Sequence, residues 1–171
     1  MITNLKERVR TGVVPPNFAE RVTFRVVEAE FTAESKSSGE PNICLKCEII
    51  RPQDVVVDGI KYDLTSCPVN FYFAYVNEKA MDSLALFHQV MGLPPEFDTE
   101  KPDVSIYKGL VFEFAISTQE DFKQRRDPKN PRKYISMFES DGKTPISLGW
   151  KWNTFLDATL RRSTEEVNRP Y

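Results

Sequence analysis

The amino-acid sequence predicts a mainly β protein, a five-stranded barrel with one helix between the third and fourth strands. Several segments alternate apolar and polar residues with the two-residue period of a strand. One segment, residues 77–92, instead carries a helical apolar stripe between recognisable start and stop signals. The chain is also rich in aromatic residues, with 12 Phe, 6 Tyr and 2 Trp in 171 residues, which is typical of β-structure.

The first two strands are predicted over residues 22–33 and 43–49. In the first strand the apolar positions change phase after Val26, which indicates a bulge or a sharp coil in a long strand. In the second strand apolar and polar residues alternate cleanly, so we expect one buried face. The polar residues between these strands, 35–41, have the composition of a turn.

A small hairpin is predicted over residues 55–64, because an Asp-Gly pair at its centre is a strong turn signal. A strongly apolar strand follows over residues 68–76. The helix over residues 77–92 is expected to begin with Asn77 as its N-cap and to end at Gly92. These assignments give the third strand and the single helix of the predicted fold.

The fourth strand is predicted over residues 106–116 and the fifth over residues 132–139, with a polar loop over residues 117–133 leading into the fifth. A weak helix is expected over residues 154–162. The order of five strands with a helix after the third matches the OB-fold, a partly open Greek-key barrel.

Three parts of the chain are distinguished by this assignment. We expect an N-terminal arm over residues 1–20, an OB-like domain over residues 21–152 and a C-terminal helix or tail over residues 153–171. The arm is predicted because Gly12, Pro15 and nearby residues break any regular pattern.

Charge is distributed unevenly along the chain, although the net charge is only −2. Residues 22–122 carry eight bases and seventeen acids, whereas residues 123–171 carry eleven bases and six acids. Residues 123–133 alone hold six bases and one acid. A phosphate backbone requires such closely spaced cations, and OB-folds hold oligonucleotides with the loop between strands four and five. The alternative is a solvated loop that only keeps the protein soluble.

Aromatic side chains are the second feature of this predicted surface, because nucleic-acid bases stack on flat rings. Tyr72 is expected to point outward, since Phe71 and Phe73 face the core. Trp150 and Trp152 share one strand face beside the basic segment. For each aromatic residue the alternative is packing in the core. The predicted nucleic-acid-binding residues are Lys36, Tyr62, Tyr72, Tyr107, Lys123, Arg125, Arg126, Lys129, Arg132, Lys133, Tyr134, Trp150 and Trp152.

Catalytic and metal chemistry find little support in the sequence. Cys44 and Cys47 form a C-x-x-C pair, but on a strand these two positions point to opposite faces. We therefore expect buried structural thiols, no metal and no cofactor. The single histidine, His88, lies on the apolar side of the helix, and no phosphate-binding glycine loop occurs. We do not expect an enzyme; a two-metal nuclease with dispersed carboxylates is the enzymatic alternative.

Four short segments carry a family resemblance. KSSGEP at residues 36–41 follows the first strand, and VMGL at residues 90–93 ends the helix. KGLVF at residues 108–112 opens the fourth strand, and DPKN at residues 127–130 precedes the fifth. Over about residues 20–140 the chain resembles the phage-encoded OB-fold single-stranded-DNA-binding proteins of replication and recombination modules. The resemblance implies an OB-fold and single-stranded DNA as the ligand.

The predicted function is single-stranded DNA binding without sequence preference, in phage replication or recombination. The implied partners are single-stranded DNA and replication or recombination proteins. Bacterial-type relatives end in an acidic tip, whereas residues 164–171 carry two acids and one base, so recruitment through the C-terminus is not predicted. No membrane span, secretory signal or disulfide framework is found, so we expect a cytoplasmic location, in the host cell if the chain is phage-encoded.

A protein–protein interaction module remains the rival hypothesis, for example a virion, inhibitor or adaptor protein without a nucleic-acid ligand. Its support is the acidic stretch over residues 22–122 and the small net charge. Steep salt dependence of oligonucleotide binding would favour the DNA hypothesis, and binding only to a protein would favour the rival. The oligomeric state is not predicted by the sequence.

Overall fold

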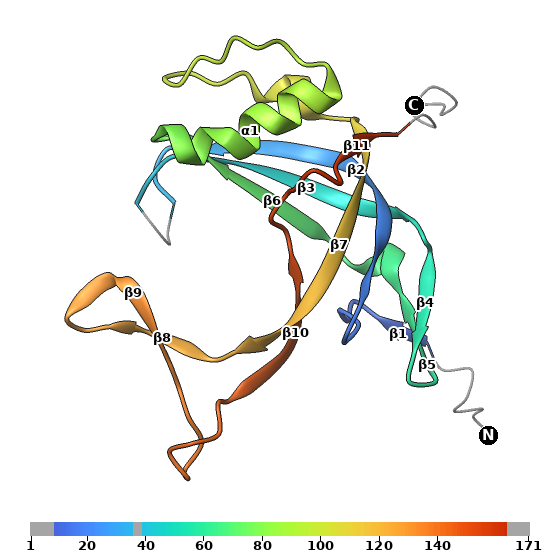
Figure 1. Cartoon of the computed structure of the whole chain (residues 1–171), viewed down its shortest axis with the longest axis vertical. Coiled ribbons are helices and arrows are strands. Elements are labelled where there is room, and N and C mark those ends of the chain that lie inside the picture. The colour runs from blue at the N-terminus through green and yellow to red at the C-terminus, as the bar shows by residue number, and fades with distance from the viewer. Residues whose placement is uncertain (1–8, 36–38, 164–171) are drawn as a thin grey trace.

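The computed structural model describes residues 9–35 and 39–163 and is mainly β, with one α-helix among these residues (Figure 1). The helix is α1 (Glu78–Met91), and two short 3₁₀ turns are η2 (Leu64–Ser66) and η3 (Val104–Tyr107). The strands are β1 (Val9–Thr11), β2 (Ala19–Thr32), β3 (Asn42–Arg51), β4 (Asp54–Val57), β5 (Ile60–Asp63), β6 (Val69–Ala74), β7 (Val111–Phe122), β8 (Gln124–Asp127), β9 (Asn130–Ser136), β10 (Ser147–Asn153) and β11 (Arg161–Arg162).

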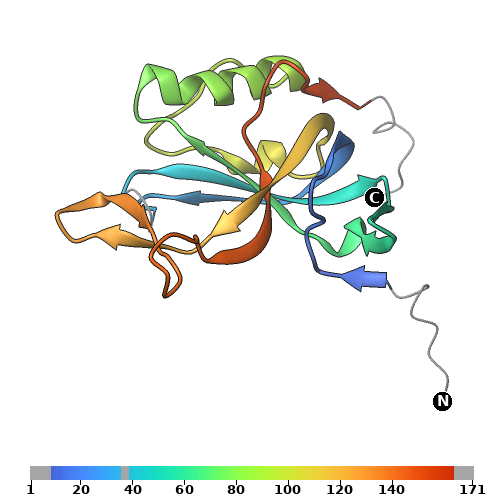
Figure 2. The same cartoon turned by 60° about the horizontal axis from the view of Figure 1, so that its bottom comes forward.

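The main sheet has the strand order β10-β7-β2-β3-β6, and the short β11 also pairs with β7. All of its ladders are antiparallel. Among the described residues no ladder joins the two edge strands, β10 and β6, so the sheet curls without closing into a barrel (Figure 1). The mainly β fold expected from the sequence is confirmed, whereas the five-stranded OB-like barrel is not. Figure 2 shows α1 lying across one face of this sheet.

The long strand β2 confirms the phase change that the sequence predicts. Its register against β3 shifts between Thr23 and Phe24 and again between Val26 and Glu28. Phe24 and Val26 are buried, whereas Val27 is exposed. The two bulges let β2 pair with β7 over residues 19–25 and with β3 over residues 23–32, because each bulge adds local twist.

Aromatic side chains from three strands form the centre of the core. The ring of Phe24 lies 5.3 Å from that of Phe112 in a stacked arrangement and 5.3 Å from that of Phe71 edge-on. Helix α1 packs on this cluster through Phe87, whose ring lies 5.4 Å from Phe112. Truncating such a buried phenylalanine to alanine typically costs about 3–5 kcal/mol of stability. The predicted core faces of residues 43–49 and 68–76 are both buried as expected.

The predicted helix is confirmed together with its caps. The side chain of Asn77 accepts a hydrogen bond from the backbone N–H of Ala80 at 2.8 Å. Gly92 adopts the left-handed conformation, with φ 68°, that ends a helix without the steric cost of a Cβ. The hairpin predicted over residues 55–64 is also observed, as β4 and β5.

The segment before the fourth strand differs from the prediction. The strand was expected from residue 106, but residues 104–107 form η3 and β7 begins at Val111. Asp103 caps this turn, since its carboxylate accepts the backbone N–H of Ser105 at 3.1 Å. The turn directs Tyr107 into the core, where the side chain is fully buried.

The fifth strand also differs from the prediction. Residues 130–136 are not part of the main sheet, because β9 pairs with β8 in a separate hairpin. Asp127 accepts the backbone N–H of Lys129 at 2.9 Å, which forms the turn between them. The fifth strand of the main sheet is instead β10, paired with β7.

Both predicted extensions are partly integrated into the fold. Residues 9–11 pair in parallel with β5, and Phe18 is buried, so the described part of the N-terminal arm is attached to the body. The predicted helix over residues 154–162 does not form. Asn153 and Asp157 cap local turns there, and the segment ends in β11. Residues 1–8 and 164–171 lie outside the described residues.

Candidate nucleic-acid interface

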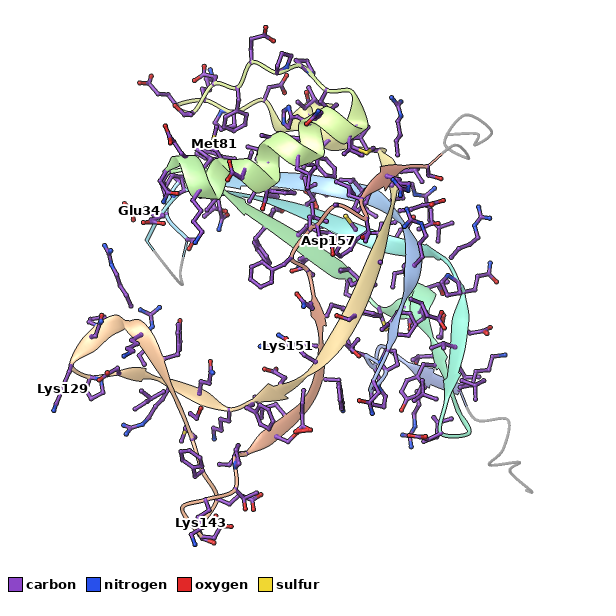
Figure 3. All side chains as sticks on the ribbon, viewed as in Figure 1. Glu34, Met81, Lys129, Lys143, Lys151 and Asp157 are labelled. Carbon is purple, nitrogen blue, oxygen red and sulfur yellow. The ribbon has the colours of Figure 1, made fainter. Side chains whose placement is uncertain are left out.

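The hairpin of β8 and β9 projects from the end of β7 away from the core (Figure 1). Together with Lys123 at its base it is here called the basic hairpin. Gln124 pairs with Ser136, Arg125 with Ile135 and Arg126 with Tyr134. No residue of the buried core belongs to this hairpin. Its side chains are therefore available to a ligand, and Lys129 marks its tip in Figure 3.

Three backbone hydrogen bonds fix the base of the basic hairpin. Lys123 donates to the carbonyl of Ile146 at 2.8 Å, Met137 donates to Lys123 at 3.0 Å, and Ile146 donates to Met137 at 3.1 Å. A two-stranded hairpin is only marginally stable alone. These three hydrogen bonds fix the direction in which the hairpin projects, so they also fix where its cations lie relative to the main sheet.

The cations of the basic hairpin are largely free of carboxylate partners. Other cations of the described chain do form ion pairs, such as Arg21 with Glu113 at 3.0 Å and Lys151 with Asp121 at 3.3 Å. Unpaired cations keep their full attraction for a phosphate backbone. In the described part of the chain, no carboxylate lies within 4.0 Å of the charged nitrogens of five exposed hairpin residues: Lys123, Arg125, Lys129, Arg132 and Lys133.

Arg126 and Tyr134 form the cross-strand pair of the basic hairpin. The guanidinium carbon of Arg126 lies 5.6 Å from the centre of the Tyr134 ring, which is within the range of a cation–π contact. Arg126 also donates to the carbonyl of Pro131 at 3.1 Å. Tyr134 remains 45% exposed. The pair therefore presents a charge and an aromatic ring side by side on the hairpin surface.

A second feature, here called the sheet groove, lies on the face of the main sheet opposite the core. Its volume is about 730 Å³. Tyr72 of β6 stands in it with 60% of its side chain exposed, as the sequence predicts for this residue. The lining residues are Glu30, Thr32, Ser35, Asn42, Cys44, Lys46 and Tyr72. A flat ring surrounded by amide, hydroxyl and charged groups is suited to stacking and hydrogen bonding with a base.

The charges of the sheet groove are paired, unlike those of the basic hairpin. The ammonium group of Lys46 lies 2.9 Å from a carboxylate oxygen of Glu30. This contact raises the pKa of Lys46. Burial raises the pKa of the Cys44 thiol, against a smaller opposing effect of its hydrogen bond with Tyr72. The groove therefore offers stacking and polar contacts rather than net positive charge.

The basic hairpin and the sheet groove lie toward the same end of the molecule. Figures 1 and 2 both place the β2–β3 connection, which borders the groove at Ser35, at the end where the hairpin projects. Figure 3 labels Glu34 of this connection and Lys129 at the hairpin tip, both at this end of the molecule.

The predicted site residues divide into four groups in the structure. Tyr72 and the residues of the basic hairpin are exposed and form the two features above. Trp150 is half-buried, and Trp152 packs edge-on against Phe18 with ring centres 5.5 Å apart, which leaves less of its face for a base. Lys36 lies outside the described residues.

The prediction that Tyr62 and Tyr107 lie on the nucleic-acid-binding surface is wrong, because both side chains are buried. Tyr62 of β5 is buried, and Tyr107 is fully buried. Tyr107 donates its hydroxyl hydrogen to Nε2 of His88 at 2.6 Å. Burial raises the pKa of this hydroxyl. Neither ring can stack on a nucleic-acid base, because both faces are enclosed by protein.

Several exposed side chains were missed by the sequence analysis. Leu148 and Phe138 are exposed close to the hairpin base, and Phe155, which is 85% exposed, follows the far end of β10. Lys46 and Asn42 of the sheet groove were missed as well. The alternation of β3 gave the signal for Lys46, which is on its polar face, but no local pattern distinguishes Phe155 from a core residue.

The cysteines form no site in this structure. Cys44, Cys47 and Cys67 are all free and buried. Burial raises the pKa of the Cys47 thiol, which keeps it protonated and unreactive. Over residues 9–35 and 39–163, no group of His, Cys, Asp and Glu side chains is arranged to hold a metal ion. No helix in that part of the chain is long and apolar enough to cross a membrane.

Comparison of the chain with family models, with curated proteins and with solved structures finds no match. The basic hairpin and the sheet groove are therefore interpreted from their own chemistry.

Proposed function

We propose that this protein binds single-stranded DNA without sequence preference. The observation that carries the proposal is the cluster of five exposed hairpin cations without a carboxylate partner among the described residues. Each cation that contacts a phosphate releases a condensed counterion, which favours binding at physiological salt. The acidic remainder of the chain confines this attraction to the hairpin.

The basic hairpin and the sheet groove contact different parts of the DNA in this proposal. The basic hairpin contacts phosphates, and Tyr134 beside Arg126 provides a ring next to them. The sheet groove receives a base on Tyr72, whose exposed ring is worth about 1–3 kcal/mol for one stacked base. Stacking does not distinguish sequences strongly, because every base has a flat face.

The strand order supports an OB-type interpretation of the fold. The sequence β10-β7-β2-β3-β6 is that of an OB barrel opened between its third and fifth strands, with the basic hairpin between its fourth and fifth strands. This position is where OB-folds hold oligonucleotides. The proposal therefore includes the resemblance to phage single-stranded-DNA-binding proteins and a role in replication or recombination.

Fluorescence anisotropy of a labelled dT oligomer tests this function. The wild-type protein is titrated at several salt concentrations, with a duplex of the same length as the comparison. We expect binding to the single strand that weakens steeply with salt and weaker binding to the duplex. Absence of binding at low salt would refute the proposal and leave a protein–protein interaction module as the account of this chain.

A further inference from the structure

An apolar pocket lies between α1 and the segment that follows it, on residues that the nucleic-acid interface does not use. Its volume is about 340 Å³, within the range of protein ligand sites. Its walls are almost entirely apolar. The lining residues are Met81, Leu84, Ala85, His88, Gln89, Leu93, Pro95 and Phe97.

Hydrogen bonds and ring contacts hold the two walls of this pocket together. A carbonyl can only accept, so Nδ1 of His88 donates to the carbonyl of Pro94 at 2.8 Å. In the neutral imidazole, Nε2 then accepts from Tyr107 at 2.6 Å. The ring of Phe97 lies 5.1 Å from Tyr75 and 6.2 Å from His88. The pocket is thus formed before any ligand binds, which reduces the entropic cost of binding.

Acidic residues outnumber basic ones in the segment that forms this apolar pocket. Residues 78–103, which contain all of its walls, carry six acids and two bases. Asp82 lies three residues before the lining residue Ala85, so both occupy the same side of α1. Glu96 is exposed between the lining residues Pro95 and Phe97. Negative charge therefore borders the pocket on both the helix side and the loop side.

We propose that this pocket docks a basic peptide segment of another protein through one large apolar side chain. The apolar walls suit a single buried anchor, which is how a few residues supply most of the binding energy at interfaces. The acidic surroundings attract flanking lysines or arginines and disfavour acidic segments. The same charges disfavour nucleic acid as the occupant, because they repel phosphates.

The pocket lies apart from the proposed DNA-binding surface. Figures 1 and 2 place α1 on the face of the sheet away from the projecting basic hairpin. A docked partner and a bound strand can therefore occupy the protein together. The proposal does not depend on the DNA-binding function, since it uses none of the same residues.

Two labelled peptides test the proposal against the full-length chain. Both carry a central tryptophan, flanked by lysines in one and by glutamates in the other. We expect the basic peptide to bind about tenfold or more tightly than the acidic one. Equal binding of both peptides, or no binding of the basic one, would overturn the proposal.

Two matched variants test whether the basic peptide binds in the pocket. Ala85→Arg places a long charged side chain at the pocket mouth, whereas Ser83→Arg adds the same charge at an exposed position that does not line the pocket. We expect Ala85→Arg to weaken basic-peptide binding about tenfold or more, with less than about a twofold effect of Ser83→Arg. Equal effects of the two variants would contradict docking in the pocket. A concentration-dependent dimer that only Ala85→Arg abolishes would make a second copy the occupant and overturn the proposed partner.

Discussion

The basic hairpin and the sheet groove both carry cations, but the cations have different surroundings. In the groove, Lys46 is held 2.9 Å from Glu30, so its charge is already compensated. On the hairpin, residues such as Lys129 and Arg132 have no carboxylate partner within the described chain. The groove lining holds one base and one acid, whereas residues 123–133 hold six bases and one acid. Because the groove cation is paired with a carboxylate, we expect the basic hairpin to attract phosphates and the sheet groove to contribute stacking and hydrogen bonds.

Removing the basic hairpin is expected to have the largest effect. If residues 124–136 are replaced by a short glycine-containing turn, the affinity for a dT oligomer should fall about 100-fold or more, since most phosphate contacts are lost. The fold should remain, because the hairpin contributes no core residue. Anisotropy measures the affinity, and thermal unfolding followed by circular dichroism is the control. If a folded variant binds the oligomer with unchanged affinity, the phosphate contacts are made by another part of the protein.

Removing the ring of Tyr72 tests the contribution of the sheet groove. Tyr72→Ala should weaken binding by about 1–3 kcal/mol, or about 5- to 150-fold, through the loss of one stacked base. Tyr72→Phe retains the ring and should bind nearly as well as the wild type. Isothermal titration with the same oligomer measures both variants. If Tyr72→Phe is as weak as Tyr72→Ala, the hydroxyl rather than stacking is responsible.

Removing the carboxylate that pairs with Lys46 should leave the sheet groove with an uncompensated positive charge, as on the basic hairpin. Glu30→Gln removes the compensating carboxylate, so we expect the affinity for the dT oligomer to rise about 2- to 5-fold at low salt. Glu113→Gln is the matched control, because it removes the same charge from the Arg21 pair on another part of the sheet. An equal gain in both variants would show that only the net charge of the protein matters.

The smallest expected effect is protection of Cys44 by bound DNA. Burial raises the pKa of this thiol above its ordinary value of 9.0, so alkylation by iodoacetamide at neutral pH should be slow and should accelerate at alkaline pH. The same shift means that any stability contributed by the protonated thiol is present below about pH 9 and is lost as the pH rises.

A saturating dT oligomer should slow this alkylation further, because Cys44 lines the sheet groove. Mass spectrometry of the modified peptides distinguishes Cys44 from Cys47 and Cys67. Cys67 is the internal control, since it lies outside the groove. Equal protection of Cys44 and Cys67 would indicate a general stabilisation of the protein rather than occupancy of the groove.

Elements with a buried face could be predicted from the sequence. The strand over residues 43–49, the strand over residues 68–76 and the capped helix each place regular apolar positions against the core. The phase change after Val26 even predicts a bulge in β2. In these elements the local pattern and the tertiary environment agree, which is why pattern reasoning succeeds.

Elements defined by distant partners could not be predicted. The strands of the basic hairpin have no buried face, and β10 is a strand because it pairs with β7, so neither has a distinctive apolar alternation. Tyr107 looks like an outward strand residue, but η3 turns it toward His88, nineteen residues earlier. The basic segment of the candidate site was found from composition, whereas the pairing of Lys46 with Glu30 required the structure.

The salt dependence of dT binding tests the central claim most directly. The slope of log affinity against log salt concentration is measured for the wild type, for Lys46→Ala and for the variant with Lys123, Arg125, Lys129 and Arg132 changed to alanine. Each lost phosphate contact on a single strand reduces the slope by about 0.7, so the hairpin variant should lose about 2–3 and Lys46→Ala close to zero. An unchanged slope in the hairpin variant would contradict the account.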